Sequence, residues 1–353
     1  ANKVRIVLTA HPTQFYPGTV LGIITDLAEA IKTDNLPEIQ SLLAQLGKTP
    51  FFKDKKPTPY DEAVNLIWYL KNVFYHSFGK IYDYTQQNIF DNRVIKNSII
   101  NIGFWPGGYR FVNPFVTPEI TLDVAKKLKQ AIIKKYIKDV KYLRRRLTFR
   151  GVREQVIDLN HKLYNTLLGK NVNEQVTLAE FRQELIVIRK QLIDNHQSLY
   201  IEKVTSLLNK TTLFGYHFAS LDIRQDSRVH DKMFKALVNE LSEQGSELFP
   251  KNFFDLTLAE QKKHLSEING TIGTATFKDE LATNISETIR AMKTIQTENG
   301  GIACNRYIIS NNQTTLNVLQ LYAMLKIVAF EDQITADIVP LFETVPDLEV
   351  SPE

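Results

Sequence analysis

Four short apolar runs of the strand type lie far apart in this 353-residue sequence, and long helical patterns separate them. They cover residues 4–8, 216–223, 306–309 and 338–342. Strands that are separated by helices pair in parallel through crossover connections, because a parallel pair cannot be joined by a tight hairpin. The sequence therefore predicts a mainly α protein with an α/β element, in which a parallel sheet or barrel lies among many helices.

The helical segments carry recognisable start signals. Residues 61–75 place apolar side chains at helical spacing. Thr117, followed by proline and an acid, is typical of a helix N-terminus, and the apolar stripe that follows predicts a helix or a pair of helices. Residues 177–180 form a capping-box sequence that recurs at 257–260. We interpret the recurrence as shared capping chemistry and find no internal repeat.

Polar residues follow the strand-like runs. His11 comes after the first run, Arg224 lies at the end of the second, and Glu343 follows the fourth. In parallel barrels, functional side chains gather at the carboxyl ends of the strands. A histidine can transfer protons, an arginine can bind a phosphate or carboxylate, and a glutamate can hold Mg²⁺. Together the three residues predict a site for a small phosphorylated or carboxylated anion.

Each of these residues also has a structural explanation. A histidine before a proline is held in an extended backbone, whatever its function. Arg224 lies between Asp222 and Asp226 in sequence, so a local ion pair is an alternative to anion binding. Glu343 at a strand end could simply be solvated. The spacing alone does not choose between the two interpretations.

Composition sets wide limits. The net charge is +4, the hydrophobic content 43% and the charged content 23%, which are ordinary values for a globular protein. The single cysteine, Cys304, excludes an internal disulfide and favours a reducing, cytoplasmic setting. No apolar run is long enough to cross a bilayer, so no membrane partner is expected. We expect one domain over 1–353, and the strands near both ends suggest a piece of a larger protein.

A basic run at residues 141–147 raises a second possibility, nucleic-acid binding. Leu143 and Leu147 within it fit a packed helical stripe, so the arginines between them fit a solvated helix face. With a nearly balanced overall charge, the sequence favours the structural explanation, and no nucleic-acid partner is expected.

Five motifs, in order along the chain, resemble motifs of the phosphoenolpyruvate carboxylase family. The first is similar to that family's histidine signature, and the second resembles its glycine-rich loop. One such motif would be weak support, whereas five in the family's order are specific. They are residues 7–14 (VLTAHPTQ), 104–117 (FWPGGYRFVNPFVT), 221–227 (LDIRQDS) with 214–215 upstream, 307–310 (YIIS) and 340–344 (PLFET).

The resemblance implies part of a (β/α)8-type barrel with long helical insertions. It implies an anaplerotic carbon-fixing lyase that joins phosphoenolpyruvate to bicarbonate with Mg²⁺ or Mn²⁺, giving oxaloacetate and phosphate for the tricarboxylic acid cycle. His11 and Arg224 would be catalytic, since His11 would stabilise carboxyphosphate and Arg224 would bind the phosphoryl group. Arg110 would also bind substrate, and Glu343 would be a metal ligand. The whole protein is expected to be a homo-oligomer.

The chain departs from the family pattern in several places. Tyr109, Phe111 and Val112 replace both aspartates and the inner glycine of the glycine-rich loop, while Arg110 remains. The family's second metal carboxylate and its mobile Gly-Arg-Gly-Gly loop have no counterpart, and its N-terminal helical part is missing too. We therefore expect a central fragment that is inactive alone. The alternative is a degenerate relative that binds an anion or a partner protein without catalysis.

Overall fold

A computed structural model describes residues 4–9, 16–51, 57–90, 100–110 and 115–351. Its centre is a five-stranded sheet in the order β1-β2-β3-β4-β5, and every neighbouring pair is parallel. The strands are β1 Val4–Leu8, β2 Ile100–Phe104, β3 Ser220–Asp226, β4 Arg306–Ser310 and β5 Asp337–Pro340. A parallel sheet in a helix-rich chain confirms the predicted fold class.

The sequence predicted four of these strands and missed β2. The first and third runs match β1 and β4 closely, and the fourth overlaps β5. The second run begins too early, because β3 starts only at Ser220. Residues before it form a turn in which Phe218 has a positive φ of 64°. β3 also continues to Asp226, so Arg224 lies inside the strand and not after it.

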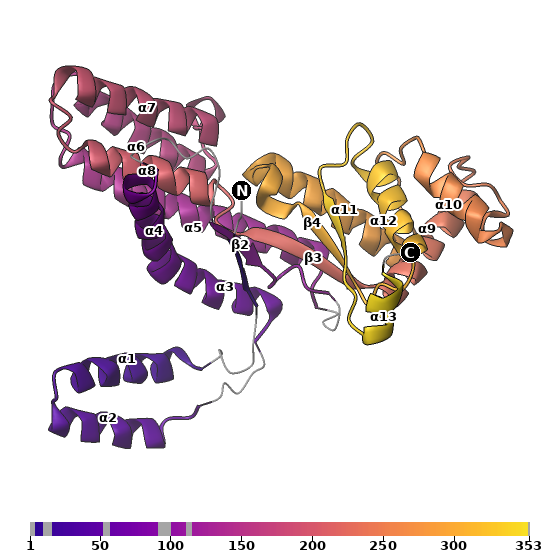
Figure 1. Ribbon diagram of the computed structural model, residues 1–353, viewed down its shortest axis with the longest axis horizontal. Helices are drawn as coiled ribbons and strands as arrows, with labels where there is room; N and C mark the ends of the chain where they lie inside the picture. The colour runs from indigo at the N-terminus through magenta and orange to yellow at the C-terminus, as the bar shows by residue number, and fades with distance from the viewer. Residues whose placement is uncertain (1–3, 10–15, 52–56, 91–99, 111–114, 352–353) are drawn as a thin grey trace.

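Helices account for most of the remaining chain (Figure 1). A π-helical turn at Leu70–Phe74 joins α3 to α4 without a break. The helices are α1 Gly18–Lys32, α2 Leu36–Lys48, α3 Pro59–Tyr69, α4 Tyr75–Asn88, α5 Pro118–Arg144, α6 Arg153–Leu168, α7 Leu178–Asn195, α8 Ile201–Phe214, α9 Ser227–Glu243, α10 Leu258–Glu267, α11 Glu280–Asn299, α12 Thr315–Val328 and α13 Val345–Val350.

The predicted helix starts are confirmed by their caps. The Thr117 side chain accepts a hydrogen bond from the Ile120 amide, and α5 then runs as one helix of 27 residues instead of a pair. Thr177 and Thr257 begin α7 and α10 with complete capping boxes. Each cap satisfies amide groups that the first helical turn leaves without partners.

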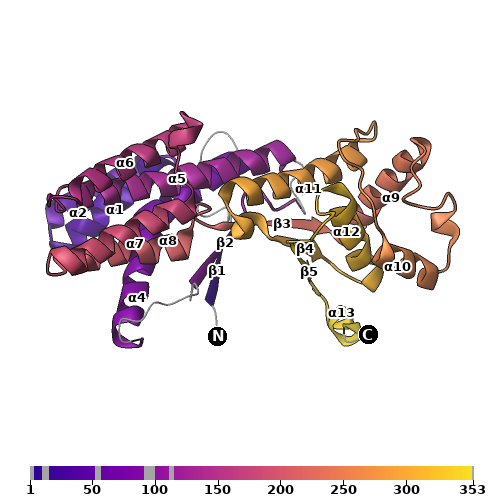
Figure 2. The same cartoon turned by 90° about the horizontal axis from the view of Figure 1, so that it is seen from above.

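The main core lies between the sheet and the helices on one of its faces and continues into the packed helices α5 to α8. Figure 2 shows α5, α11 and α12 on the same side of the strands. Tyr307 and Ile309 of β4 point into this core and are almost fully buried. The α1–α2 hairpin stands apart from this core (Figure 1), with a small apolar cluster of its own around Ile23, Ala30 and Leu42.

The basic run at the end of α5 has the predicted packing. Leu143 and Leu147 are buried in the core, whereas the three arginines between them are exposed. Within the described part of the chain, none of the helices combines the length and the apolar character that crossing a lipid bilayer requires.

Candidate functional site

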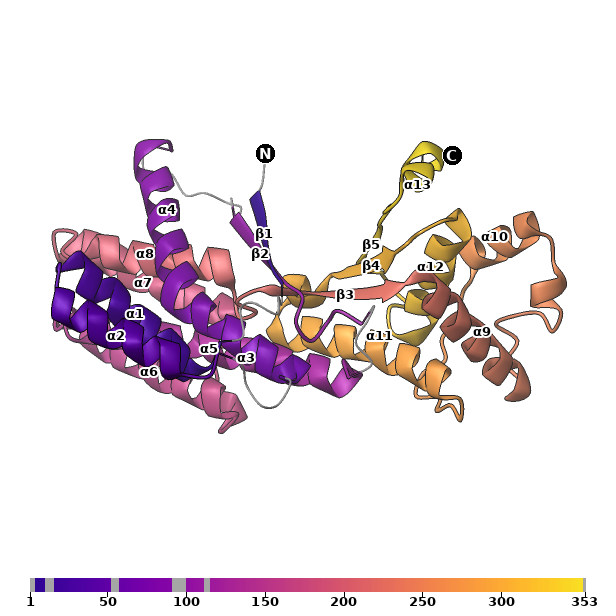
Figure 3. The same ribbon diagram turned by 90° about the horizontal axis from the view of Figure 1, so that it is seen from below.

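The face of the sheet that the helices leave uncovered carries charged and aromatic side chains. Alternate residues of a strand point to opposite faces, and Leu221 and Ile223 of β3 are buried in the core. Asp222 and Arg224 therefore point to the other face, which is turned away from α5 and α11 in Figure 3. Their partners come from β1, from the segment after β2, from the last residue of β4 and from the segment that follows β5.

Arg224 is the centre of this arrangement. Its Nη2 donates a hydrogen bond to Glu343 Oε1 at 2.7 Å, and its Nε donates to Ser310 Oγ at 2.5 Å. The guanidinium also lies over two aromatic rings, 5.3 Å from the Trp105 centroid and 5.0 Å from the Tyr109 centroid. These rings stack on each other with centroids 5.7 Å apart. Arg224 is thus held by a carboxylate, a hydroxyl and an aromatic pair.

Two glycines allow the chain after β2 to reach Arg224. Gly107 has a φ of +84°, and a Cβ there would lie 2.7 Å from Val124 Cγ2. A Cβ on Gly108 would lie only 2.2 Å from the carbonyl oxygen of Asp222. The chain then pairs with β3 beyond the turn, since the Arg224 amide donates to the Gly108 carbonyl at 3.0 Å. This close approach brings the Tyr109 ring beside Arg224.

A second ion pair involves Asp222, two residues before Arg224 in β3. Arg5 of β1 crosses β2 and donates to Asp222 Oδ1 at 2.6 Å, and Trp105 Nε1 donates to the other oxygen at 3.3 Å. A Cβ on Gly103 would lie 2.8 Å from the Arg5 guanidinium, so glycine leaves room for this crossing. Burial raises the pKa of Asp222, while Arg5 acts in the opposite direction. The pair ties β1, β2 and β3 together below Arg224.

The structure does not bring Arg110 to this group. Its amide donates to the Arg224 carbonyl at 2.9 Å, but its side chain points to the opposite face. There the guanidinium donates to Asn284 Oδ1 at 2.8 Å and to the Thr288 hydroxyl, both on α11. Burial is the main cause that lowers the pKa of Arg110. This placement suits an internal contact between the loop and α11.

His11 lies outside the described residues. Thr9, the last described residue before it, lines a cavity of about 270 Å³ together with Glu62, Trp105 and Tyr109. Trp105 and Tyr109 also contact Arg224. The cavity therefore lies next to the Arg224 group, at the carboxyl ends of β1 and β2.

The donor set for a metal is small. Among the residues that the structure describes, no three His, Cys, Asp or Glu side chains cluster in a way that could hold an ion. Glu343 offers one carboxylate, which now accepts from Arg224. Mg²⁺ commonly uses only one or two carboxylates and takes its other ligands from water and substrate. Glu343 could supply one ligand to a magnesium ion, and the other ligands would have to come from elsewhere.

Several histidines and the cysteine lie away from this group. His230 of α9 is fully buried beside Tyr307, with 5.9 Å between ring centroids. Cys304 is buried too, and burial raises the pKa of its thiol well above its usual range. Burial therefore favours an unreactive Cys304.

Tyr109, Ser310 and Arg5 are members of the site that the sequence did not single out as functional. Ser310 is the last residue of β4, lies in register with Asp226, and by the alternation along the strand points to the face opposite Ile309. Tyr109 replaces an aspartate of the family pattern, which was the available signal that this position differs. Arg5 lies in a run that looks entirely structural, and no feature of the sequence links it to Asp222.

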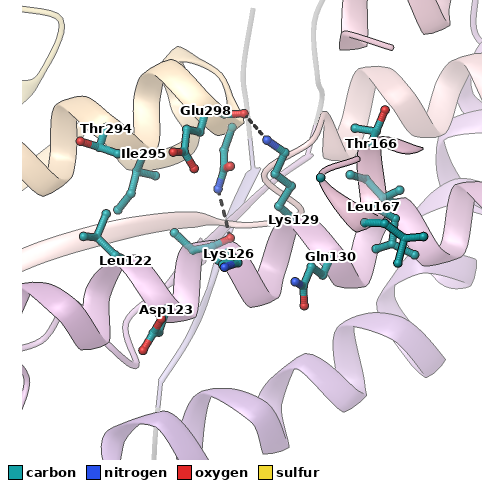
Figure 4. A pocket seen from close by; sticks show the side chains of 15 residues that line it. Leu122, Asp123, Lys126, Lys129, Gln130, Thr166, Leu167, Thr294, Ile295 and Glu298 are labelled. Carbon is teal, nitrogen blue, oxygen red and sulfur yellow. Dashed lines mark hydrogen bonds between the residues drawn. The ribbon is translucent and has the colours of Figure 1, made fainter. Parts of the chain in front are cut away.

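A larger cavity of about 550 Å³ lies elsewhere, between α5, α6 and α11 (Figure 4). In it, Lys129 donates to the Glu298 carbonyl at 2.7 Å, at the carboxyl end of α11. Its lining also includes Asp123 and Lys126, so the charges nearly balance. None of its residues belongs to a strand end, and we do not assign it to the candidate site.

Comparison with known proteins identifies the family of the chain. The family model described as "Phosphoenolpyruvate carboxylase" matches residues 1–176 and 168–353. The chain is 26% identical to phosphoenolpyruvate carboxylase of Prochlorococcus marinus subsp. pastoris, covering 99% of this chain and 43% of that protein. It is also 26% identical to the enzyme of the same name from Nitrosomonas eutropha, covering 97% and 43%. The chain thus spans less than half the length of these relatives. By the extent of the family match, this chain belongs to the phosphoenolpyruvate carboxylase family.

Proposed function

We propose that the protein containing this chain joins phosphoenolpyruvate to bicarbonate with Mg²⁺ or Mn²⁺, forming oxaloacetate and phosphate. The observation that carries the proposal is the contact between Arg224 and Glu343. One group is suited to bind an anion and the other to bind a metal ion, and strands far apart in sequence deliver both to one rim. Family membership supports the same reaction.

In this proposal, Arg224 binds the phosphoryl group of phosphoenolpyruvate. A guanidinium presents parallel N–H donors that match phosphate oxygens. Ser310 and the Trp105–Tyr109 pair hold the side chain, so its orientation is set before substrate arrives. His11 stabilises carboxyphosphate and takes its proton, as the family resemblance implies. Arg110 supports the backbone of the site from behind instead of touching substrate.

Glu343 is the group that would hold the metal ion. When bound, the ion would supply Lewis-acid stabilisation of the negative charge on the enolate oxygen. Glu343 pairs with Arg224 in this structure, so the carboxylate would have to release the guanidinium in order to bind the metal ion. The same exchange would let Arg224 turn its Nη2 donor to the phosphoryl group. Metal and substrate binding are thus expected to favour each other.

A second function is favoured by the loop after β2. Tyr109 stands where the family has an aspartate, and its ring covers the guanidinium that would meet the substrate. A relative that binds a phosphorylated or carboxylated anion, or a partner protein, without catalysis would keep Arg224 and could tolerate this change. Turnover by the whole protein separates the two functions.

The decisive experiment measures oxaloacetate formation by the whole protein. We expect Arg224→Gln to reduce kcat/KM by about 10²-fold or more, as is usual for the loss of one preorganised donor to a reacting oxyanion. Arg228→Gln is the matched control, because Arg228 is 71% exposed and pairs with Asp226. We also expect His11→Asn to abolish turnover while the fold is kept. Absence of turnover in the wild-type whole protein, with intact phosphoenolpyruvate binding, would favour the non-catalytic alternative.

The 353-residue chain on its own is expected to be inactive. Among the described residues no three His, Cys, Asp or Glu side chains cluster in a way that could hold a metal ion, and Glu343 is paired with Arg224. Turnover by this chain at a rate near that of the whole protein would contradict the expectation.

A further inference from the structure

A basic pocket lies among α4, α5 and α8. Figure 1 shows these helices in the helical part of the molecule, away from β4 and α13. It has a volume of about 250 Å³, and its lining includes Lys80, Lys203, Lys210, His76 and Asp139. We propose that this pocket binds a compact, doubly charged oxyanion of the phosphate-monoester class. The proposal does not depend on the function assigned to Arg224 and Glu343.

The strongest support is a buried ammonium group behind the pocket. Lys135 of α5 is only 9% exposed, and its Nζ lies 3.2 Å from His76 Nε2. The ammonium also lies over the Tyr75 ring, 5.0 Å from its centroid. Within the described ranges, no carboxylate comes within 4.0 Å of Lys135. Its contacts are with the neutral His76 and Tyr75 side chains, and burial lowers its pKa. While it is protonated, Lys135 therefore adds a positive charge behind the pocket that no carboxylate of the described residues pairs.

The carboxylates of the pocket are already engaged. Asp139 accepts from the Tyr75 hydroxyl at 2.8 Å and from Lys210 Nζ at 2.7 Å. Asp83 accepts from Ser206 at 2.6 Å and from Asn209 at 2.7 Å. These contacts satisfy the acids locally and leave Lys80, Lys135 and Lys203 without a carboxylate partner among the described residues.

Charge in and around the pocket is strongly one-sided. Several neighbouring ammonium groups act on Lys135 and His76, and in the part of the chain that the structure describes Lys210 is the one among them that pairs with a carboxylate. A lysine is a compact point charge that suits a phosphate oxygen. The charged groups that line the pocket or act on these two residues are Lys71 of the π-turn, Lys80 and Asp83 of α4, Lys135, Lys138 and Asp139 of α5, and Lys203 and Lys210 of α8.

His76 gives the pocket an internal reporter. Burial lowers its pKa, as do Lys135, Lys210 and Lys138, whereas Asp139 raises it. An oxyanion in the pocket would offset the ammonium charges and favour the protonated imidazole. Anion binding should therefore raise the pKa of His76, an effect specific to this place in the molecule.

The volume argues for a small ligand. A cavity of about 250 Å³ accommodates an inorganic phosphate or a small phosphate ester, whereas larger drug-sized ligands occupy roughly 300–1,000 Å³. Gly79 contributes to the shape, because a Cβ there would lie 3.0 Å from Lys210 Cε. A side chain at position 79 would press on the lysine that pairs with Asp139.

The test is an NMR titration of His76 in the 353-residue chain with inorganic phosphate, and with sodium chloride at matched ionic strength. Phosphate should raise the His76 pKa in a saturable way, with a dissociation constant of about 1 mM or tighter. Chloride at the same ionic strength should produce a much smaller, unsaturated change, because screening alone acts weakly on close charges. Equal responses to the two salts, or no saturable response, would overturn the proposal.

Three variants refine the test. Lys203→Gln changes an exposed side chain and should weaken phosphate binding about tenfold without affecting folding. Lys135→Met removes the buried ammonium and should weaken binding further. Lys126→Met, also on α5 but outside the pocket, is the control with the same change in net charge and should bind as the parent does. Equal weakening by Lys126→Met and Lys203→Gln would indicate general electrostatics and contradict a defined site.

Discussion

Arg224 and Glu343 form an ion pair across the carboxyl-terminal rim of the sheet, with 2.7 Å between Nη2 and Oε1. The two residues are 119 positions apart in sequence. Their side chains retain 12% and 32% of their exposed surface, so the pair is partly screened by water. It therefore holds the two side chains together without locking them, which is compatible with the exchange of partners that the proposed function requires.

The first prediction concerns the strength of this pair. A double-mutant cycle with Arg224→Gln and Glu343→Gln should give a coupling free energy of about 1 kcal/mol in urea unfolding. The Asp231–Lys235 pair of α9, also at 2.7 Å but more exposed, is the control and should give about 0.5 kcal/mol or less. A coupling of zero between Arg224 and Glu343 would mean that the pair contributes nothing to the rim.

The second prediction concerns metal binding to this chain. Because Arg224 competes with a cation for Glu343, Arg224→Gln should strengthen Mn²⁺ binding by roughly fivefold, the equivalent of about 1 kcal/mol. Glu343→Gln should abolish the same binding. Electron paramagnetic resonance of free Mn²⁺ measures both without any turnover. If Arg224→Gln left the affinity unchanged, the exchange of guanidinium for metal would be wrong.

The sequence predicted the convergence of Arg224 and Glu343, because chain order and the rule for parallel strand ends were sufficient. The sequence could not predict the carboxylate with which Arg224 forms an ion pair. Its sequence neighbours pair elsewhere: Asp222 with Arg5, and Asp226 with Arg228. Those choices depend on which face each side chain occupies and on which strand lies opposite, and neither is a local property.

The missed strand has a local cause. β2 contains Asn101 and Gly103, two residue types that are rare in strands. Gly103 is there because Arg5 passes over it, so a long-range contact explains a residue that looks like a strand breaker. Arg110 shows the same limit: its side chain follows the alternation beyond Gly108, which sends it to α11. Only the β3 pairing reveals that alternation.

The third prediction tests the close approach of the loop to β3. In Gly108→Ala, the new methyl group would lie 2.2 Å from the Asp222 carbonyl oxygen, and neither backbone segment can yield cheaply. We expect a loss of about 3 kcal/mol or more in the free energy of unfolding. Gly22→Ala is the matched control, because nothing lies within 4 Å of its Cβ position inside α1. It should stabilise the chain by about 0.5–1 kcal/mol, since alanine favours helix.

The fourth prediction concerns acid sensitivity. Burial lowers the pKa of both His217 and His230 to about 4. As the pH falls, these two histidines are therefore protonated in the unfolded chain before they are protonated in the folded chain. The stability that the neutral histidines contribute is fully present above about pH 6.5 and is lost as the pH falls toward 4. Between pH 6.5 and 5, the free energy of unfolding should fall by roughly 2 kcal/mol for each histidine. The raised pKa of Asp222 acts in the opposite sense.

His230→Leu separates these contributions. Neither ring nitrogen of His230 has a hydrogen-bond partner in the described structure, so an apolar side chain of similar size removes a desolvation cost. The variant should be at least as stable as the parent at pH 7 in urea unfolding, and its acid-dependent loss should be about half as large. His161→Gln, at an exposed position of α6, should keep the full loss. An unchanged pH dependence in His230→Leu would show that the buried imidazole is not what makes the fold acid-sensitive.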